Sequence, residues 1–217
     1  MAEKLTEEEK DYYALARKAW ALLAPFYDVF ASPFLSDVRD RVVRFTNAQK
    51  GSKVLDVATG TGKQAFAFAK KDYEVVGIDL SESMLNVAKK KNKYRNAKFE
   101  VADATDLPFE ESSFDVSSVS FALHEMPLSI GEKVLKEMVR VTKPKGIVVI
   151  VDYDLPKNRI GKFLIYRFIA LYEPEYYKKF IKSDLEALLN KNSIDNIEKD
   201  TVLHGVGRIL KGINNKL

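Results

Sequence analysis

The chain has 217 residues, 46% of them hydrophobic, and its 35 basic and 31 acidic side chains leave a net charge of +4. A chain of this size can bury one full core, and its small, dispersed positive excess does not indicate a nucleic-acid partner. Cysteine is absent and histidine occurs twice, so disulfides and thiolate chemistry are excluded and no metal site is expected. The N-terminus is charged where a signal peptide needs an apolar core, and no apolar run is long enough to span a bilayer, so we expect a cytoplasmic protein.

Two helices are predicted ahead of the first strand. Apolar residues at a spacing of three to four predict a helix over about residues 10–24, which Pro25 would stop. The pair Ser32-Pro33 favours the start of a second helix, since serine caps helices well and proline suits the first helical position. We expect residues 1–50 to form a helical cap or lid and residues 51–217 to form the main domain.

The central stretch of the chain is Val54-Leu55-Asp56-Val57-Ala58-Thr59-Gly60-Thr61-Gly62, an apolar run that ends in two glycines. It predicts a strand, a glycine loop and a helix. Glycine takes positive φ without a Cβ clash and lets a ligand approach the backbone, and the free N–H groups that begin a helix favour an anion. The loop also satisfies the G-x-G-x-x-A dinucleotide fingerprint, so an NAD(P)-dependent oxidoreductase is an alternative at this point.

Further strands are predicted over residues 74–79, 98–103, 114–121 and 147–151. Helices are expected between them, one capped by Ser81 and one over residues 130–141, with a turn at residues 143–146. Strands that alternate with helices predict a parallel sheet with right-handed crossovers.

The last third of the chain has a different pattern. Residues 159–180 are rich in aromatic side chains and are predicted to be helical, and Ser183 would cap a helix over residues 183–190. Two strands, 194–203 and 206–213, then form a hairpin that adds one antiparallel strand to the sheet.

This ordered set of motifs resembles the class I S-adenosylmethionine-dependent methyltransferases, nearest the ubiquinone/menaquinone C-methyltransferase-like group. The resemblance rests on the first motif at residues 54–62, on Asp79 at the end of the second strand, on Asp103-Ala104, and on Phe114-Asp115 with Ser120-Phe121. It implies an α/β fold, a Rossmann-like three-layer α/β/α sandwich whose seven-stranded, mostly parallel sheet has the order 3-2-1-4-5-7-6 with strand 7 antiparallel. It also implies S-adenosylmethionine as the cofactor and S-adenosylhomocysteine as its product.

The resemblance implies a cofactor-binding role for individual residues, and each of them also has a purely structural alternative. Asp79 could accept both ribose hydroxyls or be a solvated strand end, and Asp103 could accept from the adenine amine or begin a turn. Asp56 needs hydrogen-bond donors because a buried carboxylate is costly, which makes it a ligand contact or a brace for the loop. The expected cofactor contacts are Tyr27, Asp56, Ala58, Gly60, Thr61, Gly62, Asp79, Leu80, Met84, Asp103, Ala104, Ser120 and Phe121.

Catalysis by such an enzyme consists mainly of alignment and exclusion of water. Candidates for a general base lie just past two strand ends, with His124 and Glu125 after the fourth strand and Asp152, Tyr153 and Asp154 after the fifth. His124 is singled out as the base or acceptor-orienting group, against a hydrogen-bonded loop histidine, and His204 in the hairpin is expected to be structural.

Three departures from the quinone group are Lys145 at a usual glycine, Asp152 at a usual glutamate, and the lack of that group's Met-Asn and His-Trp pattern after Tyr27-Asp28.

The acceptor is expected to be small and apolar or aromatic, similar to a quinone, a lipid or a small metabolite. A lid stripe of Phe163, Tyr166 and Ala170 would contact it, and the same segment could touch a membrane surface transiently. Plain core packing is the alternative for these aromatic residues. A noncatalytic S-adenosylmethionine-binding module also stays open, as does the choice between monomer and homodimer.

Overall fold

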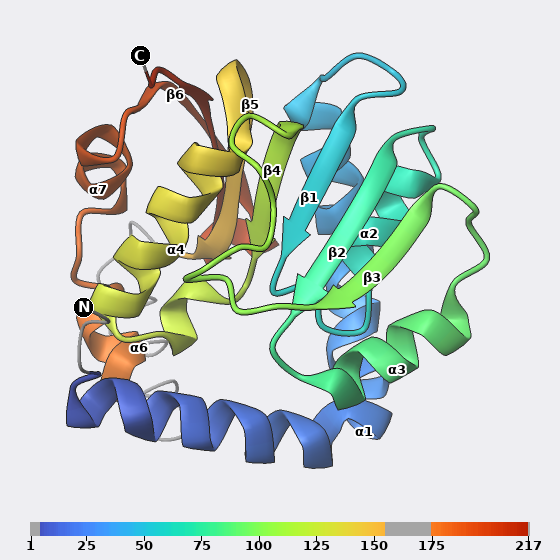
Figure 1. Ribbon diagram of the computed structural model, residues 1–217, viewed down its shortest axis with the longest axis vertical. Coiled ribbons are helices and arrows are strands. Elements are labelled where there is room, and N and C mark those ends of the chain that lie inside the picture. Colours follow the sequence, from blue (N-terminus) through green and yellow to red (C-terminus); the bar gives the residue numbers. More distant parts are fainter. Residues whose placement is uncertain (1–4, 155–174, 217) are drawn as a thin grey trace.

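The computed structural model describes residues 5–154 and 175–216, except for the side chains of residues 15, 17–34, 175 and 177. Its seven strands form one sheet with the order β3-β2-β1-β4-β5-β7-β6. β7 runs antiparallel to β5 and β6, and the other neighbouring strands are parallel. Figure 1 shows this sheet between helices. The predicted fold class and strand order are confirmed.

The strands are β1 Lys53–Val57, β2 Glu74–Asp79, β3 Ala97–Val101, β4 Phe114–Ser120, β5 Thr142–Tyr153, β6 Ile194–Val202 and β7 Gly207–Asn214. The helices are α1 Glu7–Thr46, α2 Lys63–Ala69, α3 Glu82–Lys91, α4 Leu128–Val141, α6 Glu175–Phe180 and α7 Leu185–Lys191, with short 3-10 turns η1 Leu123–Glu125 and η2 Leu203–Gly205.

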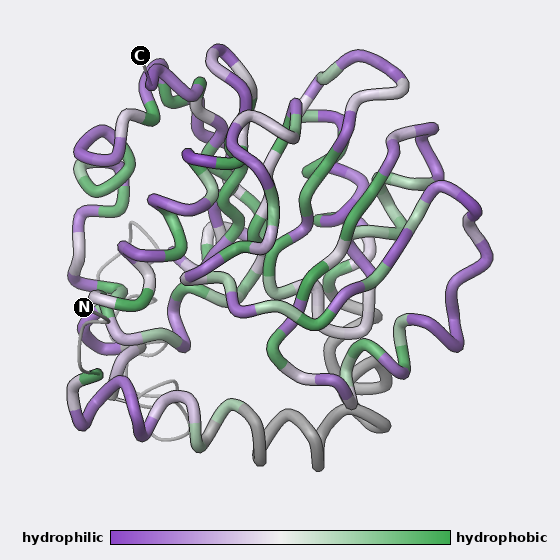
Figure 2. The backbone as a smooth tube through the Cα atoms, in the orientation of Figure 1, coloured by the Kyte–Doolittle hydropathy of each residue, from purple (hydrophilic) through white to green (hydrophobic). Residues whose placement is uncertain are grey.

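Two apolar clusters cover the two faces of the sheet. Side chains alternate between faces along a strand, so Val54 packs with α2, α3 and the C-terminal part of α1, whereas Leu55 and Val57 pack with α4 and α7. Figure 2 shows the hydrophobic residues gathered along the strands, with hydrophilic residues along the outer loops. No helix in the described ranges is both long and apolar enough to cross a membrane.

The prediction of two N-terminal helices is wrong, because α1 is one helix of 40 residues. A capping box of Thr6 and Glu9 begins it and Asn47, at φ 50°, ends it. Tyr12 and Tyr13 pack on the α4 side of the sheet, whereas Val42 packs on the other side. Helix α1 therefore passes across the carboxyl ends of the strands (Figure 1). These tertiary contacts outweigh the hydrogen bonds that its two prolines cannot donate.

Two smaller predictions also fail. The expected turn at residues 143–146 is an irregular part of β5, where the register with β4 shifts between Phe114 and Val116, and Lys145 takes φ 64°. Helix α7 is capped by Asp184, which accepts from the Ala187 N–H, and not by Ser183. The hairpin is confirmed, as is the Ser81 cap on α3. Most of the predicted 159–180 helix lies outside the described residues.

Candidate active site

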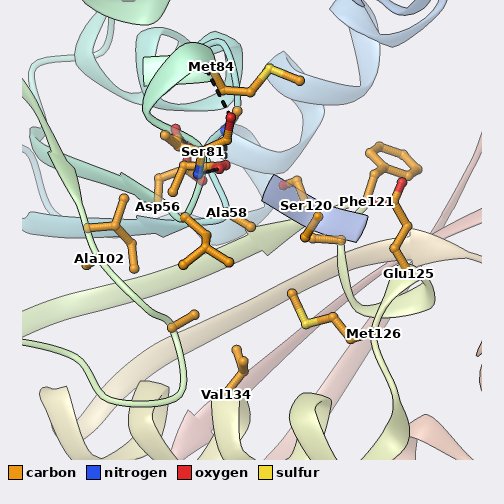
Figure 3. A pocket seen from close by; sticks show the side chains of 18 of the residues that line it. Asp56, Ala58, Ser81, Met84, Ala102, Ser120, Phe121, Glu125, Met126 and Val134 are labelled. Carbon is orange, nitrogen blue, oxygen red and sulfur yellow. Dashed lines mark hydrogen bonds between the residues drawn. The ribbon is translucent and has the colours of Figure 1, made fainter. Parts of the chain in front are cut away.

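A cavity lies at the carboxyl ends of β1, β2 and β4, where parallel sheets of this type bind ligands. Figure 3 shows it between Ser81 and Met84 on one side and Met126 and Val134 on the other. The predicted cofactor residues along its wall are Asp56, Ala58, Gly60, Thr61, Asp79, Leu80, Met84, Asp103, Ala104, Ser120 and Phe121. The side chain of Tyr27 and the predicted lid stripe lie outside the described residues.

Asp79 joins the loops that follow β1 and β2. Its Oδ2 accepts from the Gly60 N–H at 2.8 Å, and its Oδ1 accepts from the Ser81 N–H at 2.8 Å. Burial raises the pKa of Asp79, and the Ser81 and Gly60 N–H groups partly offset that rise. Each carboxylate oxygen has a second acceptor position, so Asp79 can accept two hydroxyl groups while it keeps both loop contacts.

The two glycines of the loop differ in their surroundings. Both have positive φ, 54° at Gly60 and 80° at Gly62. A Cβ at Gly60 would meet no atom within 4 Å, whereas a Cβ at Gly62 would lie 2.9 Å from Phe99 Cζ and 3.0 Å from Ala88 Cβ. Gly60 therefore leaves room at the cavity wall, and Gly62 allows the helix to pack behind it.

The carboxylate of Asp56 is buried below the loop. Its Oδ2 accepts from Thr59 Oγ1 at 2.5 Å. Burial raises the pKa of Asp56 to about 7, although the Thr59 hydroxyl and the Ala65 N–H act in the opposite direction. Asp56 thus braces the glycine loop and also reaches the cavity wall, as both alternatives from the sequence allowed.

Helix α1 contributes wall residues that the sequence did not single out, Tyr12, Tyr13 and Arg39 among them. The Tyr13 hydroxyl lies 3.1 Å from Thr105 Oγ1, which itself donates to Asp103 Oδ1 at 2.8 Å. Burial raises the pKa of Tyr12, and the carboxylate of Glu125 raises it further. In an amphipathic helix, the sequence pattern is the same for tyrosines that line a cavity and for tyrosines that pack in the core, so the sequence did not predict their place in the wall.

Glu9 fixes the N-terminal end of α1 to α4. Its carboxylate accepts from the Thr6 N–H at 2.9 Å, from Ser129 Oγ at 3.1 Å and from Lys133 Nζ at 3.1 Å. The Thr6 N–H, with help from Lys133 and Ser129, lowers the pKa of Glu9 to about 2. This anchor holds Tyr12 and Tyr13 at the cavity.

Part of the cavity wall is apolar. It comes from Ala102 after β3, from Met126 just before α4, and from Ile130 and Val134 within α4. The sequence predicted this helix but gave its side chains no role in a site, because their helical spacing is the same whether they face a sheet or a cavity. A planar, weakly polar ring is suited to such a wall.

His124 stands behind the wall. It is 3% exposed, and its Nδ1 lies 2.7 Å from Asp152 Oδ1. Of the residues that follow β4, Phe121, Ala122, Glu125 and Met126 line the cavity, and His124 is not among the described lining residues. The base predicted from sequence therefore lies one residue before a carboxylate that does line it.

These residues fit S-adenosylmethionine. Space beside Gly60 admits a ligand close to the backbone, and Asp79 can accept two hydroxyls. The buried Ser120 Oγ at the cavity has no hydrogen-bond partner among the described residues, so a polar ligand atom could satisfy it.

Comparisons with known proteins agree with this geometry. Residues 54–146 match the model of a methyltransferase domain. The chain is 39% identical over 152 residues to the demethylmenaquinone methyltransferase of Staphylococcus aureus. The aligned residues cover 68% of this chain and 62% of that protein.

Two solved structures share the fold. The first is a SAM-dependent methyltransferase from Aquifex aeolicus, with a TM-score of 0.63 and 19% identity over 97% of this chain and 99% of that chain. The second is phosphoethanolamine N-methyltransferase 2 of Haemonchus contortus in complex with S-adenosyl-L-methionine, with a TM-score of 0.72 and 17% identity over 94% of this chain and 60% of that chain.

The strand order and the domain match define the class: the chain carries a class I S-adenosylmethionine-dependent methyltransferase domain. Within that class, its sequence relatives put it near the quinone methyltransferase group. The chain spans 62% of the length of the curated relative that it matches.

Proposed function

We propose that this protein transfers a methyl group from S-adenosylmethionine to a small apolar or aromatic acceptor similar to a quinone. The observation that carries the proposal is that Asp79, Gly60 and a set of apolar side chains line one and the same cavity. Bound S-adenosylmethionine supplies an activated methyl group on a sulfonium. The protein then has to align the acceptor and exclude water, and such positioning contributes about 7–11 kcal/mol.

Most of the proposed cofactor contacts are residues that line the cavity. Asp79 accepts the ribose hydroxyls, and Leu80 and Met84 flank the ribose or adenine. Asp103 and the Ala104 N–H face the adenine edge. The methionine part lies along the loop and strand ends, at the lining residues Asp56, Ala58, Gly60, Thr61, Ser120 and Phe121. Gly62 and Tyr27, which are not among the described lining residues, are proposed as further contacts from their motifs.

The acceptor would lie between the strand ends and α1, in a site that residues 1–50 cover as a lid. The apolar wall supports an apolar acceptor. A relative whose name specifies demethylmenaquinone supports the quinone class. We propose that His124 takes part in the reaction from behind the cavity wall, as a group that accepts a proton. We also propose that the enzyme works in the cytoplasm with transient contact to a membrane surface.

A thermal-shift series tests the cofactor. S-adenosylhomocysteine at 100 times its dissociation constant should stabilise the protein by about 2.7 kcal/mol. Asp79→Asn should remove this shift, whereas Asp115→Asn, at the opposite end of β4, should keep it. Stabilisation by NADH in place of S-adenosylhomocysteine would contradict the proposal.

The acceptor is tested by mass spectrometry of reactions with reduced demethylated naphthoquinones, phenols, amines and phospholipids, in detergent and on vesicles. Methylation of the quinols alone supports the quinone class. Tight S-adenosylhomocysteine binding with no methylated product from any acceptor would favour a noncatalytic binding module. The antiparallel β7 disfavours the oxidoreductase, since dinucleotide-binding sheets have the parallel order 3-2-1-4-5-6.

A further inference from the structure

A buried carboxylate contacts His124 next to the cavity. Asp152, near the end of β5, is 0% exposed. Its Oδ1 lies 2.7 Å from His124 Nδ1 and accepts from the Tyr153 N–H at 2.7 Å. Its Oδ2 accepts from the His124 N–H at 3.2 Å. Asp152 thus contacts His124 through both the ring and the backbone.

These contacts determine the state of the imidazole ring. Both backbone groups donate to Asp152, so its carboxylate serves as an acceptor, and the ring contact is satisfied when His124 Nδ1 carries a proton. In the neutral ring the other nitrogen, Nε2, then has a lone pair, and it lies 3.7 Å from Glu125 Oε1. Edge-on contacts fix the ring plane, with centroid distances of 4.8 Å to Tyr153 and 6.3 Å to Phe180.

Glu125 connects this pair to the cavity. Its side chain is 26% exposed and lines the cavity beside Phe121 (Figure 3). Tyr12 of α1 lines the same cavity, and the Glu125 carboxylate contributes to the raised pKa of that tyrosine. A chain of three groups, Asp152, His124 and Glu125, therefore leads from the buried end of β5 to the wall.

We propose that Glu125 is the catalytic base and that Asp152 is a positioning residue that holds His124 ready to receive a proton from it. This assignment rests on the proposed methyltransferase function. An acceptor hydroxyl gives its proton to a Glu125 oxygen and keeps the electron pair. The proton then passes to His124 Nε2, and Asp152 stabilises the resulting imidazolium. The 3.7 Å gap is of the length that ligand binding commonly closes.

The tautomer of His124 can be measured without any substrate. The chain has two histidines, so a His204→Asn background leaves one imidazole for long-range ¹H–¹⁵N correlation. At mildly alkaline pH this ring should show a proton on Nδ1 alone. Asp152→Asn and Asp152→Ala should move it toward the Nε2–H form, and Asp200→Asn, which removes a surface partner of Arg41, should leave it unchanged.

A wild-type ring protonated on Nε2, or one that keeps its Nδ1–H form in both Asp152 variants, would overturn the positioning role. If one variant fails to fold, the wild-type spectrum and the other variant still decide the question.

Activity tests the base separately. Glu125→Gln should keep the thermal shift with S-adenosylhomocysteine and lower kcat by about 10²–10⁴-fold on the acceptor identified above. Normal turnover by this variant would overturn the role of Glu125. If the wild-type protein does not bind S-adenosylhomocysteine at all, the proposed function fails, and the assignment of Glu125 as base fails with it. The tautomer measurement still judges Asp152 in that case, so the two failures are distinguishable.

Discussion

Asp56 should make the protein less stable as the pH rises. In the unfolded chain its pKa is near 3.8, and in the folded protein burial raises it to about 7. The folded state therefore binds the proton more tightly, so the free energy of unfolding falls as the pH rises from about 4 to about 7 and levels off above that. A shift of about three pKa units corresponds to about 4 kcal/mol, at up to about 1.4 kcal/mol per pH unit.

Asp56→Asn removes this titration and leaves Thr59 Oγ1 an oxygen to which it can donate. The free energy of unfolding, from urea denaturation at several pH values between 5 and 8, should fall with pH less steeply in the variant than in the wild type. The stability difference should shift toward the variant by about 2.5 kcal/mol over that range, since the rest of the change of about 4 kcal/mol lies below pH 5. Asp72→Asn, at an exposed residue paired with Lys50, is the matched control. A wild-type–variant difference that stays constant with pH would refute the reasoning.

Substitutions in the glycine loop, at Glu9 and at Lys145 test three separate parts of the structure. Gly62→Ala should cost about 2–4 kcal/mol of stability, because it combines positive φ with a clash against Phe99, while Gly60→Ala should cost about 1–2 kcal/mol. Glu9→Gln should cost about 1–2 kcal/mol at neutral pH; because the pKa of Glu9 is lowered, this difference should vanish as the pH falls from 4.5 toward 2. Lys145→Gly should stabilise the protein by about 0.5–1 kcal/mol, since glycine tolerates the φ of 64° there. Urea denaturation measures all of them, and a neutral Gly62→Ala, a pH-independent Glu9→Gln or a destabilising Lys145→Gly would each contradict its premise.

The sequence predicted the sheet well because local and global signals agree there. Val54, Leu55 and Val57 form a short apolar run ahead of a glycine loop and a helix, and this local pattern predicts a buried strand. The final hairpin has its own turn signal at His204-Gly205. Helix α1 was predicted as two helices because the rule that proline ends a helix considers only the neighbouring residues. Contacts of α1 with both faces of the sheet come from residues distant in sequence, and no spacing within residues 10–46 reveals them.

Part of the site was predicted from local motifs, and the rest depends on contacts between residues that are distant in sequence. Asp79 and Gly60 occupy positions that a motif fixes, and the structure brings them within 2.8 Å of each other. The sequence named Glu125 among the candidate bases but singled out His124, because a carboxylate beside a histidine has no distinguishing pattern. The partnership of His124 with Asp152 crosses from one strand end to another, so only the folded sheet shows it.

The central claim is that the cavity beside Gly60 and Asp79 binds the cofactor. A crystal structure of the protein with S-adenosylhomocysteine tests it most directly. We expect the ribose hydroxyls within hydrogen-bond distance of both Asp79 oxygens, with the adenine next to Asp103. A ligand bound elsewhere on the protein, with this cavity filled by side chains, would contradict it.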